Sequence, residues 1–133
     1  MNAAKATRAA DVRDAVAQFV SAMNQGNVEA ALAMYEPQAV IVARPGVMAQ
    51  GTAALREALA AFIALKPTLT SEVEEVVEAG DIALYCSRWS LRGTDPAGQP
   101  VQMSGRSSDV LRRQRDGSWL IAVDNPWGTD IVG

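Results

Sequence analysis

The residues with the clearest chemical potential lie in two strand-like runs near the carboxyl end, joined at Asp116 and Gly117. An Asp-Gly pair between β-prone runs is a strong hairpin signal, because glycine supplies the positive φ that a tight turn needs. If Gly117 takes the left-handed position of a three-residue loop, Ser108 lies opposite Asp124. Arg106 then lies diagonal to Asp124, within reach of its carboxylate. A two-residue loop would shift this pairing by one residue.

The first of these registers predicts the lining of an enclosed pocket. Alternation of side chains along each strand puts one set on the inner face of the hairpin: Ser104, Arg106, Ser108 and Val110 from the first strand, and Leu120, Ala122 and Asp124 from the second. The preceding strand-like run completes the predicted wall with Tyr85, Ser87 and Trp89. An apolar hollow that holds a few polar groups is the usual form of a small-molecule site.

Asp124 and Arg106 are the candidate catalytic residues, and each has two interpretations. Asp124 acts as a general acid or base, with a pKa that burial raises and a neighbouring arginine lowers, or it forms an ion pair with Arg106 that braces the fold. The forked donors of Arg106 also suit a carboxylate or enolate oxygen of a ligand, to which Ser108 would add a hydroxyl. The sequence leaves these alternatives open.

Other candidates for ligand contact come from outside the hairpin. Phe19 and Met23 lie on the apolar side of the first predicted helix. Tyr35, at the end of the second predicted helix, either points its phenol into the pocket or serves as a core aromatic. Trp127 follows the last strand, where it either closes the mouth of the pocket or packs on the first helix.

The composition restricts the chemistry more than it identifies it. The chain of 133 residues has a net charge of −3, no histidine and a single cysteine, Cys86. These counts remove Ser-His and Cys-His nucleophile pairs, the histidine-based zinc and iron sites, and an internal disulfide. The basic residues are scattered, which argues against a nucleic-acid partner. We therefore expect chemistry without a metal or cofactor, based on carboxylates, tyrosine, lysine, arginine or hydroxyl groups.

The hydrophobic pattern also bears on location and size. The first residues lack the apolar core of a signal peptide, and no apolar run is long enough to span a bilayer, so a cytoplasmic protein without a membrane partner is expected. Hydrophobic residues make up 49% and charged residues 20% of the chain. These are ordinary values for a globular protein, and they predict one domain over 1–133 with its core at about 10–128.

The positions of the elements follow from periodicity and from helix caps. The first helix is predicted over roughly 9–25, the second from its cap Asn27 to Glu36, and the third from its cap Thr52 to Lys66. A small hairpin is expected at 39–43 and 47–50, followed by long strands at about 68–78, 82–92, 100–114 and 118–126. Helices that precede a meander predict an α+β domain, with the helices on one face of a curved antiparallel sheet.

Several short segments, in this order and spacing, resemble one known family. They are Phe19-Val-Ser-Ala-Met-Asn-Gln-Gly-Asn-Val, Ala39-Val-Ile-Val, Gln50-Gly-Thr-Ala-Ala-Leu-Arg-Glu57 and the terminal Asp-Gly-Ser-Trp-Leu-Ile strand. Over about 10–128 the chain resembles the SnoaL-like and ketosteroid isomerase-like branch of the nuclear transport factor 2-like superfamily. The resemblance implies a cone-shaped antiparallel or mixed sheet wrapped around N-terminal helices, an apolar pocket at its wide end, and a homodimer through the outer face of the sheet.

The residues that the resemblance assigns to catalysis are different in this chain. Ketosteroid isomerases use an acidic base, a tyrosine and a protonated aspartic acid. By spacing, these positions fall on Ala43 or Arg44, on Phe19 and on Ser108, so a standard ketosteroid isomerase is not expected. The superfamily holds many functions. The predicted function is a pocket for a small apolar metabolite, either in a metal-free acid/base enzyme of the isomerase, cyclase or dehydratase kind, or in a non-catalytic binding or dimeric interaction module.

Overall fold

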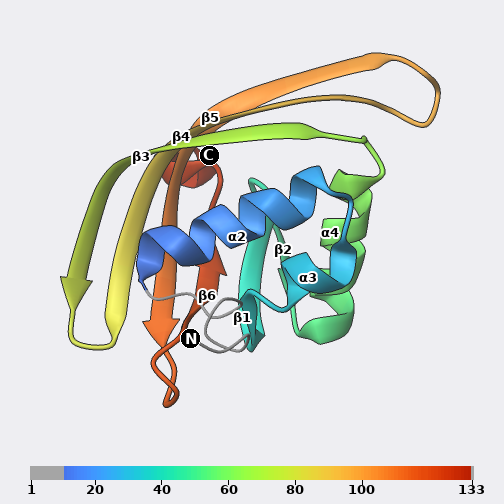
Figure 1. Ribbon diagram of the computed structural model, residues 1–133. Helices are drawn as coiled ribbons and strands as arrows, with labels where there is room; N and C mark the ends of the chain where they lie inside the picture. Colours follow the sequence, from blue (N-terminus) through green and yellow to red (C-terminus); the bar gives the residue numbers. More distant parts are fainter. Residues whose placement is uncertain (1–10, 133) are drawn as a thin grey trace.

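Residues 11–132, which the computed structural model describes, form a curved six-stranded sheet around one long helix (Figure 1). The strand order is β2-β1-β6-β5-β4-β3, in which β1 and β6 run parallel and the other neighbours run antiparallel. The strands are β1 (Tyr35–Arg44), β2 (Val47–Gln50), β3 (Thr68–Ala79), β4 (Ile82–Thr94), β5 (Pro100–Arg113) and β6 (Trp119–Asp124). The helices are α2 (Val12–Asn24), α3 (Val28–Leu32), α4 (Thr52–Ile63) and the 3-10 turn η1 (Gly128–Val132). The predicted α+β class with a curved mixed sheet is confirmed.

Helix α2 crosses the concave side of the sheet and supplies one wall of the interior. Its N-cap is Asp11, whose carboxylate accepts a hydrogen bond of 2.9 Å from the backbone N–H of Asp14. Its buried side chains are Val12, Ala15, Val16, Ala22 and Met23, at the spacing that the sequence predicts. The helix begins three residues later than predicted, and residues 9 and 10 lie outside the described part of the chain.

The second predicted helix is much shorter than expected. Helix α3 ends at Leu32, and Tyr35 belongs to β1. The backbone N–H of Ile121 donates to the carbonyl oxygen of Met34 over 2.8 Å, and Tyr35 is the register partner of Ile121. The segment from Tyr35 onward therefore pairs with β6 instead of continuing the helix. The predicted extension of the second helix to Glu36 was wrong.

The third helix starts and ends differently from the prediction. Gly51, with φ 88°, is its N-cap without a side-chain hydrogen bond, and Thr52 is its first helical residue. Beyond Ile63 the chain turns at Lys66, which has φ 51°. The turn is fixed by β4, because the N–H of Thr94 donates to the carbonyl oxygen of Leu65 over 2.7 Å.

A β-bulge in β6 decides which side chains face the interior. At the start of the hairpin Arg113 pairs with Trp119 and Leu111 pairs with Ile121, which is the register predicted from a three-residue loop. The next pair is Val110 with Val123, so one extra residue enters β6 between them. From this point on Asp109, rather than Ser108, lies opposite Asp124.

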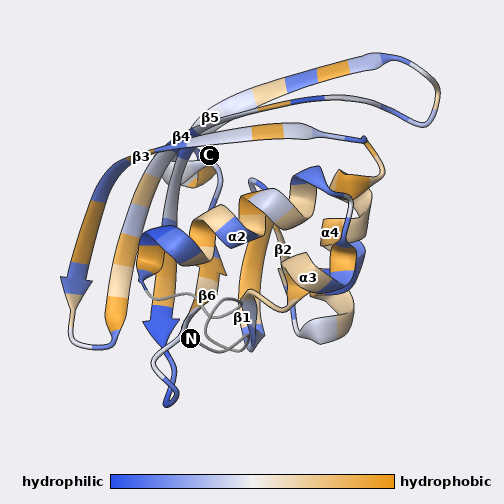
Figure 2. Cartoon of the chain, in the orientation of Figure 1, coloured by the Kyte–Doolittle hydropathy of each residue, from blue (hydrophilic) through white to orange (hydrophobic). Residues whose placement is uncertain are grey.

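The hydrophobic core lies between the helices and the concave face of the sheet. The largest fully buried side chains are Ile41, Leu55, Leu59, Leu111 and Val12. Figure 2 shows hydrophobic residues along β1 and β6, which lie behind α2, and hydrophilic residues at the ends of β3 and β5. Among the described residues, no helix has the length and apolar character needed to cross a membrane.

Candidate functional site

A cavity of about 90 Å³ lies between α2, α4 and the inner face of the sheet. Its lining is apolar except for a few serine and aspartate side chains. The apolar residues are Val16, Phe19, Val20, Met23, Ile41, Leu59, Phe62, Leu69, Trp89, Leu91, Ile121, Pro126 and Trp127, and the polar residues are Ser71, Ser87, Ser107, Asp109 and Asp124. The cavity is therefore a hydrophobic chamber whose polar groups come from β3, β4, β5 and β6.

Two carboxyl groups, those of Asp109 and Asp124, meet at one side of this cavity. They are hydrogen-bonded to each other across β5 and β6, because the bulge makes the two residues face one another. The phenol of Tyr35 donates to Oδ2 of Asp124 over 2.5 Å, and the backbone N–H of Asn125 donates to Oδ1 of Asp109 over 2.8 Å. Both carboxyl groups keep part of their surface open to the cavity.

Burial and mutual repulsion keep a proton on this pair. Burial, followed by the charge of Asp124, raises the pKa of Asp109 well above its ordinary value. Burial also raises the pKa of Asp124, although hydrogen bonds from Tyr35 and Asp109 oppose the rise. Burial, with the charge of Asp124 next, raises the pKa of Tyr35 well above its ordinary value. The two carboxyl groups therefore titrate as a pair that retains a proton above the ordinary range of an aspartate, and the phenol of Tyr35 donates to the Asp124 side of this pair.

A strip of hydroxyl groups continues from the carboxyl pair along the inner face of the sheet. Ser107 is hydrogen-bonded to Asp109, and its Oγ lies 2.5 Å from Oγ of Ser87, its register partner on β4. Ser71 on β3 is hydrogen-bonded to the phenol of Tyr85. These bonds satisfy the serine hydroxyls inside an otherwise apolar surface.

Two tryptophans form the end wall of the cavity near the carboxyl terminus. Their rings pack edge to face with centroids 5.7 Å apart. The indole N–H of Trp89 donates to the carbonyl oxygen of Pro126 over 2.7 Å, and that of Trp127 donates to the carbonyl oxygen of Val42 over 2.8 Å. Gly105 makes this approach possible, because a Cβ there would come within 3.1 Å of the Pro126 oxygen and 3.2 Å of the Trp89 nitrogen.

Many of the side chains predicted for the pocket do line it. The lining residues that the sequence predicts are Phe19, Met23, Ser87, Trp89, Asp124 and Trp127. Tyr35 reaches the same site through its bond to Asp124, and it does so from β1 rather than from a helix. Tyr85 is buried beside the cavity, where it is the register partner of Asp109.

The structure places Arg106 outside, contrary to the predicted inner face of β5. Its side chain is 67% exposed and its Nε lies 3.4 Å from a carboxylate oxygen of Glu74 on β3. Ser108 and Val110 share this outer face, and Ala122 is taken up by the bulge. The prediction assumed regular alternation on both strands, and the bulge breaks it. The predicted contact between Arg106 and Asp124 is therefore wrong, because the two side chains lie on opposite faces of the sheet.

Asp109 and Ser107 are the polar residues that the sequence reasoning missed. They alternate with Leu111, which is fully buried, so the position of this leucine carried the signal. Reading β5 from Leu111 toward its start would have put Ser107 and Asp109 inside. Ser71 was missed for a different reason, since the predicted β3 run was assigned no face.

The family follows from a match to the greater part of the chain. Residues 16–121 match the model of the SnoaL-like domain. The chain therefore belongs to the SnoaL-like family, as its resemblance to that family predicted. Among curated proteins, no relative matches this sequence.

Solved structures show the same fold at low sequence identity. A ketosteroid isomerase-like protein from Erwinia carotovora atroseptica superposes with a TM-score of 0.74 at 24% identity, covering 85% of this chain and 89% of the other. A nuclear transport factor 2-like superfamily protein from Salmonella enterica serovar Typhimurium gives a TM-score of 0.74 at 15% identity, covering 84% of each chain. A putative calcium/calmodulin-dependent protein kinase II association domain from Xanthomonas campestris gives 0.68 at 20% identity, with 83% and 79% covered. At these identities the likeness establishes the fold and not an activity.

Proposed function

We propose that the cavity binds a small, mostly apolar organic molecule and that the carboxyl pair exchanges a proton with its polar group. The observation that carries this proposal is the meeting of Asp109 and Asp124 at the wall of an apolar cavity. Two carboxyl groups whose protons leave at different pH values provide an acid and a base in one site. This pair replaces the pair of Asp124 and Arg106 that the sequence suggested.

The division of roles follows from the hydrogen bonds. Asp109 holds the shared proton and acts as the acid, because the charge of Asp124 opposes its ionisation. Asp124 acts as the base, since Tyr35 and Asp109 both donate to it and stabilise its charged form. Ser107 bonds to Asp109 and holds its carboxyl group against the cavity wall. Neither role requires a metal ligand or a histidine.

The test of catalysis is the exchange of a carbon-bound proton. Small carbonyl compounds would be incubated with the protein in D₂O, and deuterium incorporation followed by NMR. We expect exchange with the unchanged protein and its loss in Asp124→Asn, with a melting temperature within a few degrees because the amide keeps the shape of the carboxyl group. Exchange at equal rates in Asp124→Asn, or no exchange with any compound, would reject the acid/base role.

A non-catalytic binding module is the second candidate. It is favoured by the saturation of Asp124, whose charge is already taken up by the donors Tyr35 and Asp109. In that case ligands would shift the NMR signals of Trp89 and Trp127 in the unchanged protein and in Asp124→Asn. Neither protein would exchange the carbon-bound proton of the ligand. Binding without exchange thus separates this module from the enzyme.

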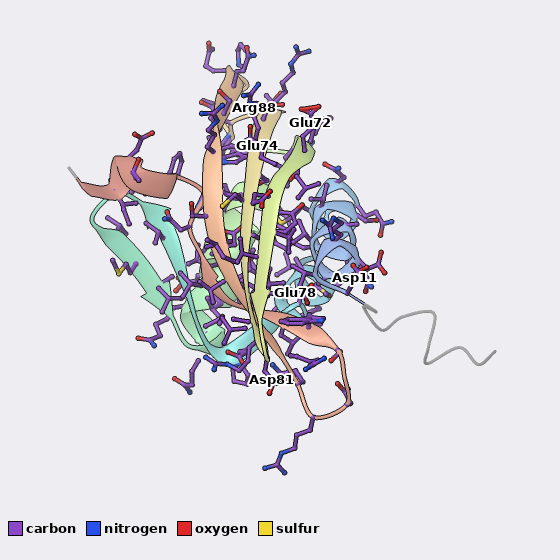
Figure 3. All side chains as sticks on the ribbon, turned by 90° about the vertical axis from the view of Figure 1, so that its left-hand side faces the viewer. Asp11, Glu72, Glu74, Glu78, Asp81 and Arg88 are labelled. Atoms are coloured by element: carbon purple, nitrogen blue, oxygen red, sulfur yellow. The ribbon has the colours of Figure 1, made fainter. Side chains whose placement is uncertain are left out.

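We also propose a homodimer through the outer face of the sheet. A row of register partners crosses five strands on that face: Val77, Leu84, Val110, Val123 and Val40. Val77 is 51% and Leu84 is 40% exposed, which is unusual for apolar side chains on a sheet. Figure 3 shows Glu72, Glu74 and Arg88 gathered at one end of these strands. Charges of both signs beside an apolar row suit a twofold contact, in which each patch meets its own copy.

The dimer is tested by one charge in the apolar row. Leu84→Glu is expected to convert the dimer into a monomer in sedimentation equilibrium, because it buries an unpaired carboxylate in the contact. Gln102→Glu is the matched control, since Gln102 lies on the same face but on the projecting β4–β5 hairpin (Figure 1). A monomeric unchanged protein at micromolar concentration would reject the dimer.

A further inference from the structure

The cavity is acceptor-rich, and its side-chain donors are already used. Trp89 and Trp127 carry the only side-chain N–H groups among the described lining residues, and both are bonded to backbone carbonyl oxygens. The hydroxyl of Ser87 donates to that of Ser107, which in turn donates to Asp109. The hydroxyl of Ser71 is bonded to the phenol of Tyr85. No lysine or arginine is among the described residues that line the cavity. An incoming polar group therefore meets carboxyl oxygens and no cation.

Aromatic rings make up much of the remaining wall. Phe19 and Phe62 line the cavity from the two helices, and Trp89 and Trp127 line it from the sheet side. Because both indole N–H groups are taken, the tryptophans present carbon to the interior. Aromatic rings attract a cation through their quadrupole, and most strongly where water is excluded.

We infer that the polar group of the ligand is an amine, bound as its ammonium ion between the carboxyl pair and the aromatic wall. This inference depends on the proposed function, since it requires that the cavity binds a ligand. The N–H groups of the ammonium donate to Asp124 and Asp109, and its hydrocarbon part lies against the rings. A carboxylate or phosphate would face the charge of Asp124 without a compensating cation, and a neutral alcohol gains a hydrogen bond to that charge but no attraction between opposite charges.

Entry of an ammonium ion changes the protonation of the pair, although no covalent bond forms or breaks. The cation favours the ionised form of both carboxyl groups, so the proton that they share passes to solvent. The groups that face the pair are Tyr35 from β1 and Tyr85 from β4, while α2 and α4 present only apolar side chains to the cavity. Burial raises the pKa of Tyr85, although the charge of Arg13, on α2, lowers it. The affinity for the ammonium ion is therefore expected to rise with pH until the carboxyl pair of the free protein has lost its shared proton.

The volume of the cavity limits the size of the ligand. A cavity of about 90 Å³ is smaller than the roughly 150 Å³ apolar cavity that accepts benzene. Benzene has six non-hydrogen atoms, so ligands of about four non-hydrogen atoms are the largest that this cavity holds without rearrangement. Isopropylammonium is thus a suitable probe, and 2-propanol is its neutral match in size and shape.

The experiment compares three probes of four non-hydrogen atoms each, namely isopropylammonium, 2-propanol and acetate. Dissociation constants would come from tryptophan fluorescence and from NMR titration of the two indole N–H signals. We expect the ammonium to bind at least about tenfold more tightly than the alcohol, since only the ammonium adds attraction between opposite charges to its hydrogen bond with the carboxyl pair. The carboxylate is expected not to bind. Raising the pH from 5 to 8 should tighten ammonium binding and leave alcohol binding unchanged.

Variants separate the inference from the function on which it depends. Asp124→Asn should remove the preference for ammonium and change alcohol binding less than threefold, whereas Asp14→Asn, on the exposed side of α2, should change neither. Asp109→Asn provides the same comparison if Asp124→Asn does not fold. Equal or tighter binding of the alcohol, or binding of the carboxylate, overturns the ammonium inference and leaves ligand binding standing. If none of the three probes binds, both the ammonium inference and the proposed ligand-binding function are rejected.

Discussion

The two faces of β5 carry polar groups in opposite electrostatic settings, although Arg106 and Asp109 lie only a few positions apart in the sequence. On the outer face Arg106 lies in solvent and shares Glu74 with Arg88, its register partner on β4. On the inner face Asp109 shares a proton with Asp124, and no lysine or arginine is among the described residues that line the cavity beside it. On the outer face one carboxylate lies between two guanidinium groups, whereas the inner charge is held by hydrogen bonds alone. An inner carboxyl pair without a counter-ion is suited to chemistry or binding rather than to stability.

The largest expected difference between the faces is in packing. Leu111 is fully buried on the inner side, and Val110, its neighbour, lies on the outer side. Leu111→Ala is expected to lower the free energy of unfolding by about 2–5 kcal/mol, as removal of buried methyl groups leaves a cavity. Val110→Ala should cost less than about 1 kcal/mol in the monomer, because part of that side chain is already exposed. Urea denaturation measures both, and equal losses would contradict the assignment of faces.

The next difference is in the response to pH. The pKa of Asp109 is raised in the folded state, while an unfolded aspartate titrates at about 3.9. The folded chain therefore binds more protons above this value, and stability falls as pH rises from about 4 through the folded pKa, by at most about 1.4 kcal/mol per pH unit. Asp109→Asn cannot ionise, so it should weaken this fall and be the more stable protein at high pH.

Denaturation of both proteins between pH 4 and 8 tests this prediction. The amide of the variant keeps the bonds of the site, since its oxygen accepts from Asn125 and its nitrogen donates to Asp124. Any slope that remains in the variant belongs to Asp124, whose pKa burial also raises. Parallel stability curves for the two proteins would show that Asp109 carries no shifted proton.

The same bulge explains how much of the site could be predicted from the sequence. The fold class and most strands follow from periodicity, and the hairpin register at Arg113 and Trp119 follows from the Asp-Gly turn. Asp124 was expected inside because Ser108 was expected opposite it. The bulge shifts the pairing by one residue, so Asp124 lies inside with Asp109 as its partner. No local sequence signal marks a bulge in a run of hydrophobic residues, and long-range pairing is what decides it.

The boundary of α3 shows the same limit in a helix. Helical spacing carried the prediction through Tyr35, but that residue pairs with Ile121 far along the chain. Its phenol consequently enters the site from a strand and bonds to Asp124. Tertiary pairing overrides local propensity here, since it satisfies the backbone and also places a polar group at the cavity.

A smaller effect is expected where an inner hydrogen bond is removed. Tyr35→Phe deletes the donor to Asp124 and should lower the free energy of unfolding by about 1 kcal/mol. The pKa of Asp124 should rise further, because the bond from Tyr35 lowers it. Carbon-detected NMR titration of the carboxyl group measures this shift. Tyr85→Phe is the matched control, since its hydroxyl bonds to Ser71 rather than to the pair, and an equal shift there would contradict the assigned contact.

The smallest effect is expected at the residue that sequence reasoning placed at the centre of the site. Arg106 is exposed and its ion pair with Glu74 is long, at 3.4 Å, so Arg106→Gln should change the free energy of unfolding by less than about 0.5 kcal/mol. It should also leave binding of the ammonium probe unchanged, because the side chain lies on the far side of the sheet from the cavity. The variant would be compared by urea denaturation and by the same fluorescence titration. A loss of binding comparable with that of Asp124→Asn would mean that the guanidinium reaches the carboxyl pair in solution, and that the two faces are not electrostatically separate.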